Sequence, residues 1–220
     1  CTVVFDPRVV STLLSVVASA LSGEAVVKGR SLFAGRIGES VAVGGVSLVD
    51  DPTDPRAFGA TSHDGEGLAC RRNVLISDGV LRMFVFDTVS ACRAGTASTG
   101  SAVRGGFAGT PSAGCRALVL APGGKGHDAI LAAVGDGLYV QSISGVHSGV
   151  NPVSGDFSVG AEGLKIEGGA LAQPVREVTV ASTLQRMLQS VVEIGNDLRW
   201  LPGVAAGQTL AIADMALSGD

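Results

Sequence analysis

The chain has 220 residues, a net charge of −4 and a mean hydropathy of +0.40, with 46% hydrophobic and 16% charged residues. This length can bury a substantial core, and an acidic balance without a Lys- or Arg-rich run argues against nucleic-acid binding. Ser, Gly or a charged residue interrupts every apolar run, so we predict no membrane-spanning segment. The 32 glycines follow no period, which favours many tight turns.

The first predicted element is a helix that begins at Pro7 and ends at Gly23. Asp6 can cap it, Pro7 suits the first helical position, and Phe5 can pack on Val10 as a hydrophobic staple. Apolar residues then recur at helical spacing, which predicts a packed helix rather than a secretory signal.

Short β-like runs follow. Strands are predicted at 40–49, 69–76 and 80–86. Ser77-Asp78-Gly79 is typical of a hairpin turn, and the turn-forming residues of 50–55 indicate a loop.

The middle of the chain alternates between surface segments and regular elements. The glycine-rich stretch 88–110 predicts a long surface segment with one helical turn near 91–93. A strand at 116–121, a helix at 127–134 and a strand at 138–143 follow.

The stretch from Gly145 to Gly169 predicts a turn-rich entry and two short strands, because apolar residues alternate with polar or small ones at 157–161 and 164–166. A helix is predicted at 182–197, capped by Ser182, and 208–217 supplies a closing strand. Many strands with few flanking helices predict a β-rich α+β fold with a closed or strongly curved, mostly antiparallel sheet.

Potential reactive groups are sparse. The four cysteines are too widely spaced for a zinc knuckle, so we expect reduced, mostly buried thiols: Cys1, Cys70, Cys92 and Cys115. The three histidines are far apart in sequence and form no zinc-peptidase helix motif. His63-Asp64-Gly65-Glu66 groups three potential ligands, but on a flexible turn that favours a solvated loop over a metal site.

Four motifs resemble the C-terminal half of the TldD/PmbA family of peptidases, and its PmbA (TldE) branch in particular: Asn151 to Gly160, Glu167-Gly168-Gly169, Pro174-Val175 and Ile194-Gly195-Asn196-Asp197. Further matching segments occur earlier in the same order, at 29–39, 64–67, 98–100 and 120–123. The resemblance therefore covers essentially all of residues 1–220, and it implies that the family's N-terminal half lies before Cys1.

The resemblance implies a β-barrel-like C-terminal domain of a non-catalytic subunit. Such a subunit would pair with a TldD-type catalytic subunit in a cytoplasmic zinc metallopeptidase complex that degrades or matures unfolded peptides. In isolation it could form a homodimer. In this family zinc is bound by a His-Glu-x-x-x-His helix and a Cys of the TldD-type subunit. This chain lacks that helix motif and has no Cys in its tail at 202–207. We therefore expect no cofactor and no catalysis in this chain alone.

Two sets of side chains are candidate site residues. An extended peptide can be held by backbone hydrogen bonds along a strand edge, and 150–157 is the predicted lining, with peptide contacts from Asn151, Ser154, Asp156 and Phe157. The family's Asp-x-Glu-Gly segment occurs in catalytic and non-catalytic members, which implies that Asp64 and Glu66 order a loop.

Other functions remain open. Cys1 followed by Thr2 could mark an N-terminal nucleophile hydrolase or a lipid-bearing lipoprotein Cys. A capped helix at Asp6 and the lack of a flexible tether favour a boundary inside a longer protein. The chain could also be an interaction or scaffold domain repurposed in a biosynthetic pathway.

Overall fold

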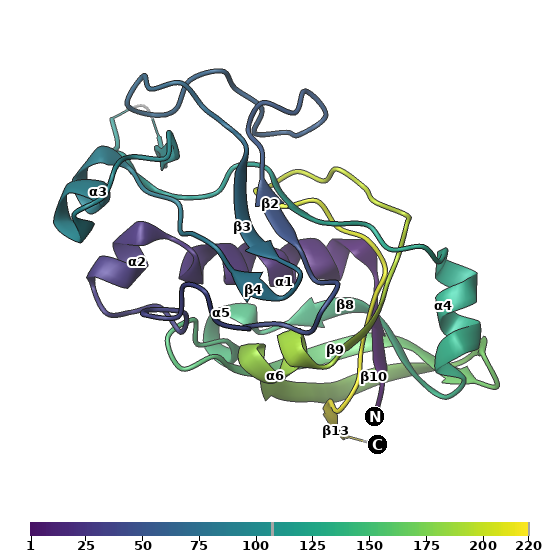
Figure 1. Ribbon diagram of the computed structural model, residues 1–220. Helices are drawn as coiled ribbons and strands as arrows, with labels where there is room; N and C mark the ends of the chain where they lie inside the picture. Colours follow the sequence, from purple (N-terminus) through teal and green to yellow (C-terminus); the bar gives the residue numbers. More distant parts are fainter. Residues whose placement is uncertain (107, 220) are drawn as a thin grey trace. The chain divides into compact units, whose positions relative to one another are not determined.

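The structure is a computed structural model that describes residues 1–106 and 108–219. The chain forms two compact units. The first contains Cys1–Leu13, Pro122–Arg199 and the chain from Gly207 onward, and the second contains Leu14–Ala121 and Trp200–Ala206. Figure 1 shows their helices and strands. No helix in the described part of the chain is both long and apolar enough to cross a membrane.

The first unit is built on one strongly curled seven-stranded sheet, in the order β11-β12-β1-β8-β9-β10-β13. Neighbouring strands are antiparallel except for β1 and β8, which are parallel. The predicted β-rich α+β fold with a strongly curved, mostly antiparallel sheet is confirmed. The strands are β1 (Val3–Phe5), β8 (Gly137–Ser144), β9 (Asp156–Glu167), β10 (Ala170–Thr183), β11 (Val191–Ile194), β12 (Leu210–Ile212) and β13 (Ala216–Ser218).

β9 and β10 form a long hairpin beside the edge strand β13 of this sheet. The two short strands predicted in this region are one continuous strand, β9, and the sequence analysis missed β10. Gly168 and Gly169 have φ of 55° and 81°, which is the left-handed backbone of a two-residue hairpin turn. The continuity of β9 depends on Gly163, where a Cβ would lie 1.8 Å from the Tyr139 carbonyl oxygen of β8.

A helix covers part of this sheet. α4 (His127–Val134) forms where it was predicted. Its apolar residues Ile130 and Leu131 join a buried cluster with residues of four strands: Val4, Tyr139, Ile166 and Ala211. This cluster fixes α4 against the sheet because burying each large apolar side chain contributes about 1.5–3 kcal/mol.

The first helix, α1 (Pro7–Ala20), begins as predicted, with Asp6 Oδ1 accepting a 2.9 Å hydrogen bond from the Arg8 amide. Its predicted end at Gly23 is wrong. Ser22 bridges Val85, and Gly23 begins a second short helix, α2 (Gly23–Val27). A Cβ on Gly23 would lie 2.1 Å from the Phe86 ring, so this glycine permits close packing rather than ending α1.

The second unit contains a four-stranded sheet in the order β4-β3-β2-β7 and a two-stranded sheet of β5 and β6. The predicted hairpin is confirmed, since Ser77 pairs with Val80 across Asp78 and Gly79, whose φ angles are 50° and 77°. The predicted strands around it are shorter than expected. The elements are β2 (Leu48–Asp50), β3 (Asn73–Ser77), β4 (Val80–Leu81), α3 (Thr88–Ala94), β5 (Ala102–Val103), β6 (Ser112–Ala113) and β7 (Leu118–Leu120).

The helix predicted at 182–197 is mostly wrong. Only α6 (Leu184–Gln189) is helical, and its cap is Thr183, whose hydroxyl accepts a 3.3 Å hydrogen bond from the Arg186 amide. The β-branched residues that follow form β11 instead, because they pair with β12. The predicted closing strand at 208–217 is interrupted at Asp214, whose φ is 56°, and divides into β12 and β13.

Candidate functional site

The segment 150–157, predicted to line a peptide, is a closed turn. Val150 bridges Phe157, and the Asn151 amide donates a 2.9 Å hydrogen bond to the Asp156 carbonyl. Asn151 Oδ1 accepts hydrogen bonds from the amides of Val153, at 2.9 Å, and Ser154, at 3.3 Å. The backbone of this segment therefore pairs mainly with itself.

The start of α6 supports this turn. The Leu184 amide donates a 2.7 Å hydrogen bond to the Gly155 carbonyl, and Gln185 Nε2 donates to the Ser154 carbonyl at 3.1 Å. Ser154 Oγ donates to Asp156 Oδ2 at 2.6 Å. The backbone at the tip of the turn is thus held in place by α6.

The four predicted contact residues differ in exposure. Asn151, Ser154 and Asp156 are exposed and lie together on the turn. Phe157, in contrast, is buried, with only 1% of its surface exposed. Asn151 Oδ1 is used by the turn, and the Asn151 Nδ2 amide and the Asp156 carboxylate are further polar groups on these exposed residues.

The carboxylates of Asp64 and Glu66 organise a loop in the second unit. Asp64 is 8% exposed, and its Oδ1 accepts 2.9 Å hydrogen bonds from the Glu66 and Leu68 amides. Its Oδ2 accepts a 3.0 Å bond from the Ala102 amide. Glu66 Oε2 accepts from the Thr88 amide at 2.9 Å and hydroxyl at 2.7 Å. Each carboxylate joins segments that are distant in sequence.

Three polar contacts, which were not predicted from the sequence, surround the aromatic contact of His127 with Tyr139. The Tyr139 hydroxyl donates a 2.8 Å hydrogen bond to Asp6 Oδ2, and the two rings lie 4.9 Å apart between centroids. His127 Nδ1 lies 3.2 Å from Thr209 Oγ1, which donates to Asp197 Oδ2 at 2.8 Å. Tyr139 is the chain's only tyrosine, and it lies between the apolar residues Leu138 and Val140, which was the one local signal.

These interactions have an electrostatic consequence. Burial, and then the hydrogen bond to Asp6, raise the pKa of Tyr139 well above its ordinary value. The phenol is therefore a fixed donor at neutral pH. We assign this group of residues a structural role, because it joins the start of α1 to the sheet.

The four cysteines are free, and the expectation of mostly buried thiols is wrong. Cys1 and Cys92 are exposed, Cys70 is partly buried, and only Cys115 is buried. Burial raises the pKa of the Cys115 thiol well above its ordinary value, which disfavours the reactive thiolate.

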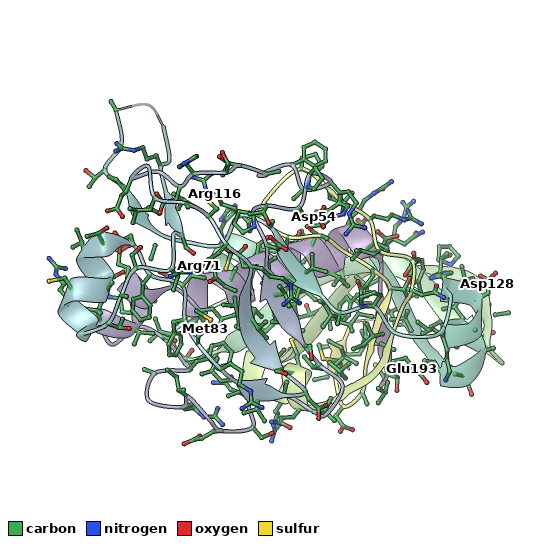
Figure 2. The ribbon with its side chains drawn as sticks, turned by 45° about the horizontal axis from the view of Figure 1, so that its top comes forward. Asp54, Arg71, Met83, Arg116, Asp128 and Glu193 are labelled. Atoms are coloured by element: carbon green, nitrogen blue, oxygen red, sulfur yellow. The ribbon has the colours of Figure 1, made fainter. Side chains whose placement is uncertain are left out.

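A buried carboxylate lies in the same unit as Cys115. Asp50 is fully buried, and its Oδ1 accepts hydrogen bonds from the Arg116 amide, at 2.9 Å, and the Ala117 amide, at 2.8 Å. Burial raises the pKa of the Asp50 carboxyl, although these amides oppose the shift. Figure 2 labels Arg116 among the side chains of the second unit.

Metal-ligating side chains are scattered. His63 lies in a loop, His127 begins α4, and His147 lies in α5 (Val146–Gly149). In residues 1–106 and 108–219, no group of three or more His, Cys, Asp and Glu side chains could hold a metal ion.

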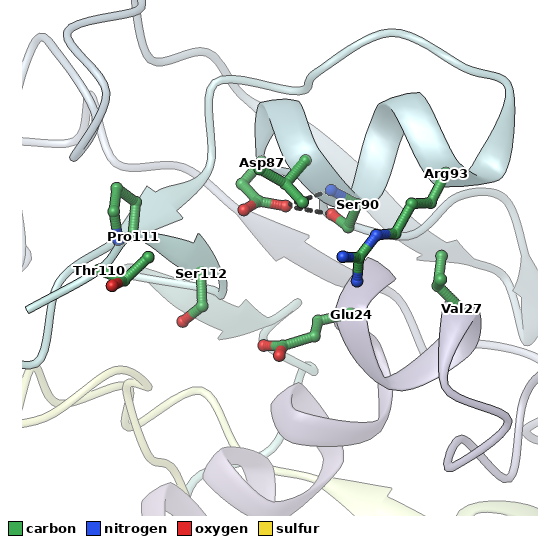
Figure 3. A pocket seen from close by; sticks show the side chains of 9 residues that line it. Glu24, Val27, Asp87, Ser90, Arg93, Thr110, Pro111 and Ser112 are labelled. Carbon is green, nitrogen blue, oxygen red and sulfur yellow. Dashed lines mark hydrogen bonds between the residues drawn. The ribbon is translucent and has the colours of Figure 1, made fainter.

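A small cavity lies between α2 and α3. Its volume is about 170 Å³, and it is lined by Glu24, Asp87, Ser90, Arg93 and neighbouring residues. Figure 3 shows the Arg93 side chain reaching from α3 toward α2, while Asp87 caps α3 through its 2.9 Å bond from the Ser90 amide. Ligand pockets usually measure about 300–1,000 Å³, so this cavity is too small for a substrate.

Comparisons with known proteins agree over nearly the whole chain. The family described as "PmbA/TldA metallopeptidase C-terminal domain" matches residues 1–219. The chain is 28% identical over 217 residues to Metalloprotease PmbA of Escherichia coli O157:H7, and the matched region covers 99% of this chain and 45% of that protein. It is 28% identical over 216 residues to a metalloprotease of Methanothermobacter thermautotrophicus, and the matched region covers 96% of this chain and 47% of that protein.

A solved structure extends this similarity to the fold. The crystal structure of TldE from Thermococcus kodakarensis superposes with a TM-score of 0.92 at 29% identity, covering 99% of this chain and 50% of that chain. The chain thus spans about half the length of the relatives it matches.

Proposed function

Because the chain belongs to the PmbA/TldD metallopeptidase family, we propose that it is the C-terminal domain of a non-catalytic, PmbA- or TldE-type subunit. The whole protein would pair with a TldD-type catalytic subunit in a cytoplasmic zinc metallopeptidase complex. The observation that carries this proposal is the family match over residues 1–219, in a chain whose histidines lie on separate elements.

The side chains of this domain do not fit a zinc site. A catalytic zinc ion needs three protein ligands that converge on one point. The three histidines lie in a loop, α4 and α5, and no ligand group forms among the described residues. In the proposed complex, the catalytic partner would hold the zinc ion and this domain would contribute a binding surface.

The proposed contribution is to position an extended peptide. Asn151, Ser154 and Asp156 present polar groups on a turn that α6 holds in place. A rigid polar surface can bind peptide backbone groups without selecting particular side chains, which suits unfolded substrates. Because the backbone of 150–157 pairs mainly with itself, these side chains would make the contacts.

Size-resolved co-purification tests the partnership. The full-length protein would be co-expressed with the TldD-type subunit of the same cell, and the masses of the eluted species would be measured. The proposal predicts a stable hetero-oligomer. If the two proteins elute separately at micromolar concentrations, the proposed pairing is wrong and the scaffold alternative gains support.

A further inference from the structure

β13 has a free backbone edge beside a large cleft. β13 is the last strand in the sheet order, so it pairs with β10 on one side and with no described strand on the other. Its three residues are all exposed, and Leu217 is 45% exposed. The cleft has a volume of about 750 Å³ and an apolar floor that includes Leu138, Ile166, Val175 and Val178.

The start of β1 points into this cleft. The Cys1 nitrogen donates a 2.8 Å hydrogen bond to the Met215 carbonyl, and the Met215 amide donates a 3.0 Å bond back to the Cys1 carbonyl. Such a reciprocal pair is the repeating unit of an antiparallel ladder. Figure 1 shows the start of the chain beside β13.

The direction of the backbone N–H and C=O groups of β13 defines which segment could pair with this strand. Successive residues of a strand direct their N–H and C=O groups to opposite edges, so Leu217 directs these groups to the same side as Met215. An extended segment that ran beyond Cys1 in line with β1 would therefore meet the free backbone groups of Leu217. Cys1 itself lines the cleft, together with the charged residues Asp136, Lys165 and Glu167.

We propose that this cleft receives an extended polypeptide segment joined to Cys1 on its N-terminal side, which adds to β13 as an antiparallel strand. Its backbone would pair with Leu217, and alternate side chains would cover the apolar floor. The segment would also blunt an exposed strand edge, which is otherwise prone to unwanted pairing.

Two observations favour a segment joined to Cys1 over a separate molecule as the occupant of this cleft. The Cys1 nitrogen already lies in the ladder with Met215, and a peptide bond at that nitrogen keeps an N–H for the same hydrogen bond. The relatives are about twice as long as the part that this chain matches, and the matched part is described as a C-terminal domain, so they have polypeptide on this side. The inference is independent of the proposed peptidase partnership.

The test compares two six-residue extensions joined to Cys1, one alternating Val and Thr and the other made of Gly and Ser. Leu217→Cys is the reporter, in a background where the exposed Cys1 and Cys92 are replaced by Ser. The rate at which a thiol reagent labels this position is measured in native protein. Val153→Cys, on the exposed turn, is the control position, since Val153 is 47% exposed.

We expect the Val-Thr extension to slow labelling at position 217 at least tenfold relative to the Gly-Ser extension, with no change at position 153. Hydrogen exchange of the Leu217 amide, measured without the cysteine substitution, should also be slower with the Val-Thr extension. This second measurement remains usable if the Leu217→Cys variant folds poorly. Equal rates with both extensions would overturn the proposal. Equal protection by the same Val-Thr peptide added in trans would also overturn it, because the cleft would then belong to a separate partner.

Discussion

The hydroxyl of Tyr139 donates a 2.8 Å hydrogen bond to Asp6 Oδ2, while Asp6 Oδ1 accepts the Arg8 amide at the start of α1. One carboxylate thus caps a helix and satisfies the phenol of a strand that is parallel to β1. The two hydrogen bonds of Asp6 thus connect the start of α1 to the curled sheet. Their contribution to the free energy of unfolding can be measured by substitution.

Tyr139→Phe removes the hydroxyl but keeps the ring beside His127. We expect a loss of roughly 1.5–3 kcal/mol in the free energy of unfolding near pH 7, because the bond is to a charged acceptor. The raised pKa of Tyr139 adds a pH dependence. Above about pH 10 the unfolded phenol loses its proton while the folded one keeps it, so stability falls as pH rises.

Urea unfolding of both proteins between pH 8 and 11 measures this effect. The wild-type free energy of unfolding should fall more steeply than that of Tyr139→Phe above about pH 10. Parallel curves for the two proteins would show that the Tyr139 pKa is not raised by folding.

In the Asp78-Gly79 turn, replacing the glycine should lower the stability of the fold. Gly79→Ala places a Cβ 2.4 Å from the Ala42 carbonyl oxygen at a φ of 77°, so we expect a loss of at least ~2 kcal/mol. Gly45→Ala is the matched control, since its φ is 88° but nothing lies within 4 Å of the added Cβ. Equal urea midpoints for the two variants would refute the close approach at Gly79.

Asp64→Ala removes a buried carboxylate that accepts three backbone amides. We expect a loss of roughly 2–4 kcal/mol, together with faster hydrogen exchange at the Ala102 amide, because buried donors are left without an acceptor. Glu39→Ala is the control, since that exposed side chain pairs only with Arg36 at the surface and should change stability little. An unchanged Ala102 exchange rate would contradict a loop-ordering role.

Two substitutions at one position separate turn structure from peptide contact. Asn151→Ala removes the Oδ1 acceptor that holds the turn, whereas Asn151→Asp keeps an acceptor and removes the Nδ2 donor. If the amide binds peptide, both variants should raise the KM for peptide cleavage by the complete complex several-fold. A raised KM in Asn151→Ala alone would mean that Asn151 only shapes the turn.

Local signals predicted the elements that local chemistry controls. The start of α1 at Pro7, the Asp78-Gly79 hairpin and α4 all follow from caps, turn residues and periodicity. β10 was missed although the two-residue Gly168-Gly169 turn before it is a local hairpin signal. β11 could not be found from local signals. The residues after Gln189 have a helical apolar pattern, yet they pair with β12, which is a long-range interaction that no local window contains.

In the candidate site, too, local sequence predicted some features, whereas others depend on long-range contacts. The turn residues of 150–157 could be identified as a turn from Asn, Pro, Ser and Gly, and the structure adds that α6 holds it. The alternation that marked Phe157 as part of a strand also predicts a buried face, so its burial was available from the pattern. The contacts of Asp6, Tyr139 and His127 depend on tertiary packing. The only local indication was a lone tyrosine between two apolar residues.

We propose that this domain serves a zinc peptidase without supplying its chemistry. The most direct measurement is the rate at which an unfolded peptide is cleaved by the full-length protein, by the TldD-type subunit and by their mixture, each with and without a zinc chelator. We predict cleavage by the mixture that the chelator abolishes, and none by the full-length protein alone. Cleavage by this protein alone, unaffected by the chelator and lost in Cys1→Ser, would contradict the account and assign the chemistry to Cys1.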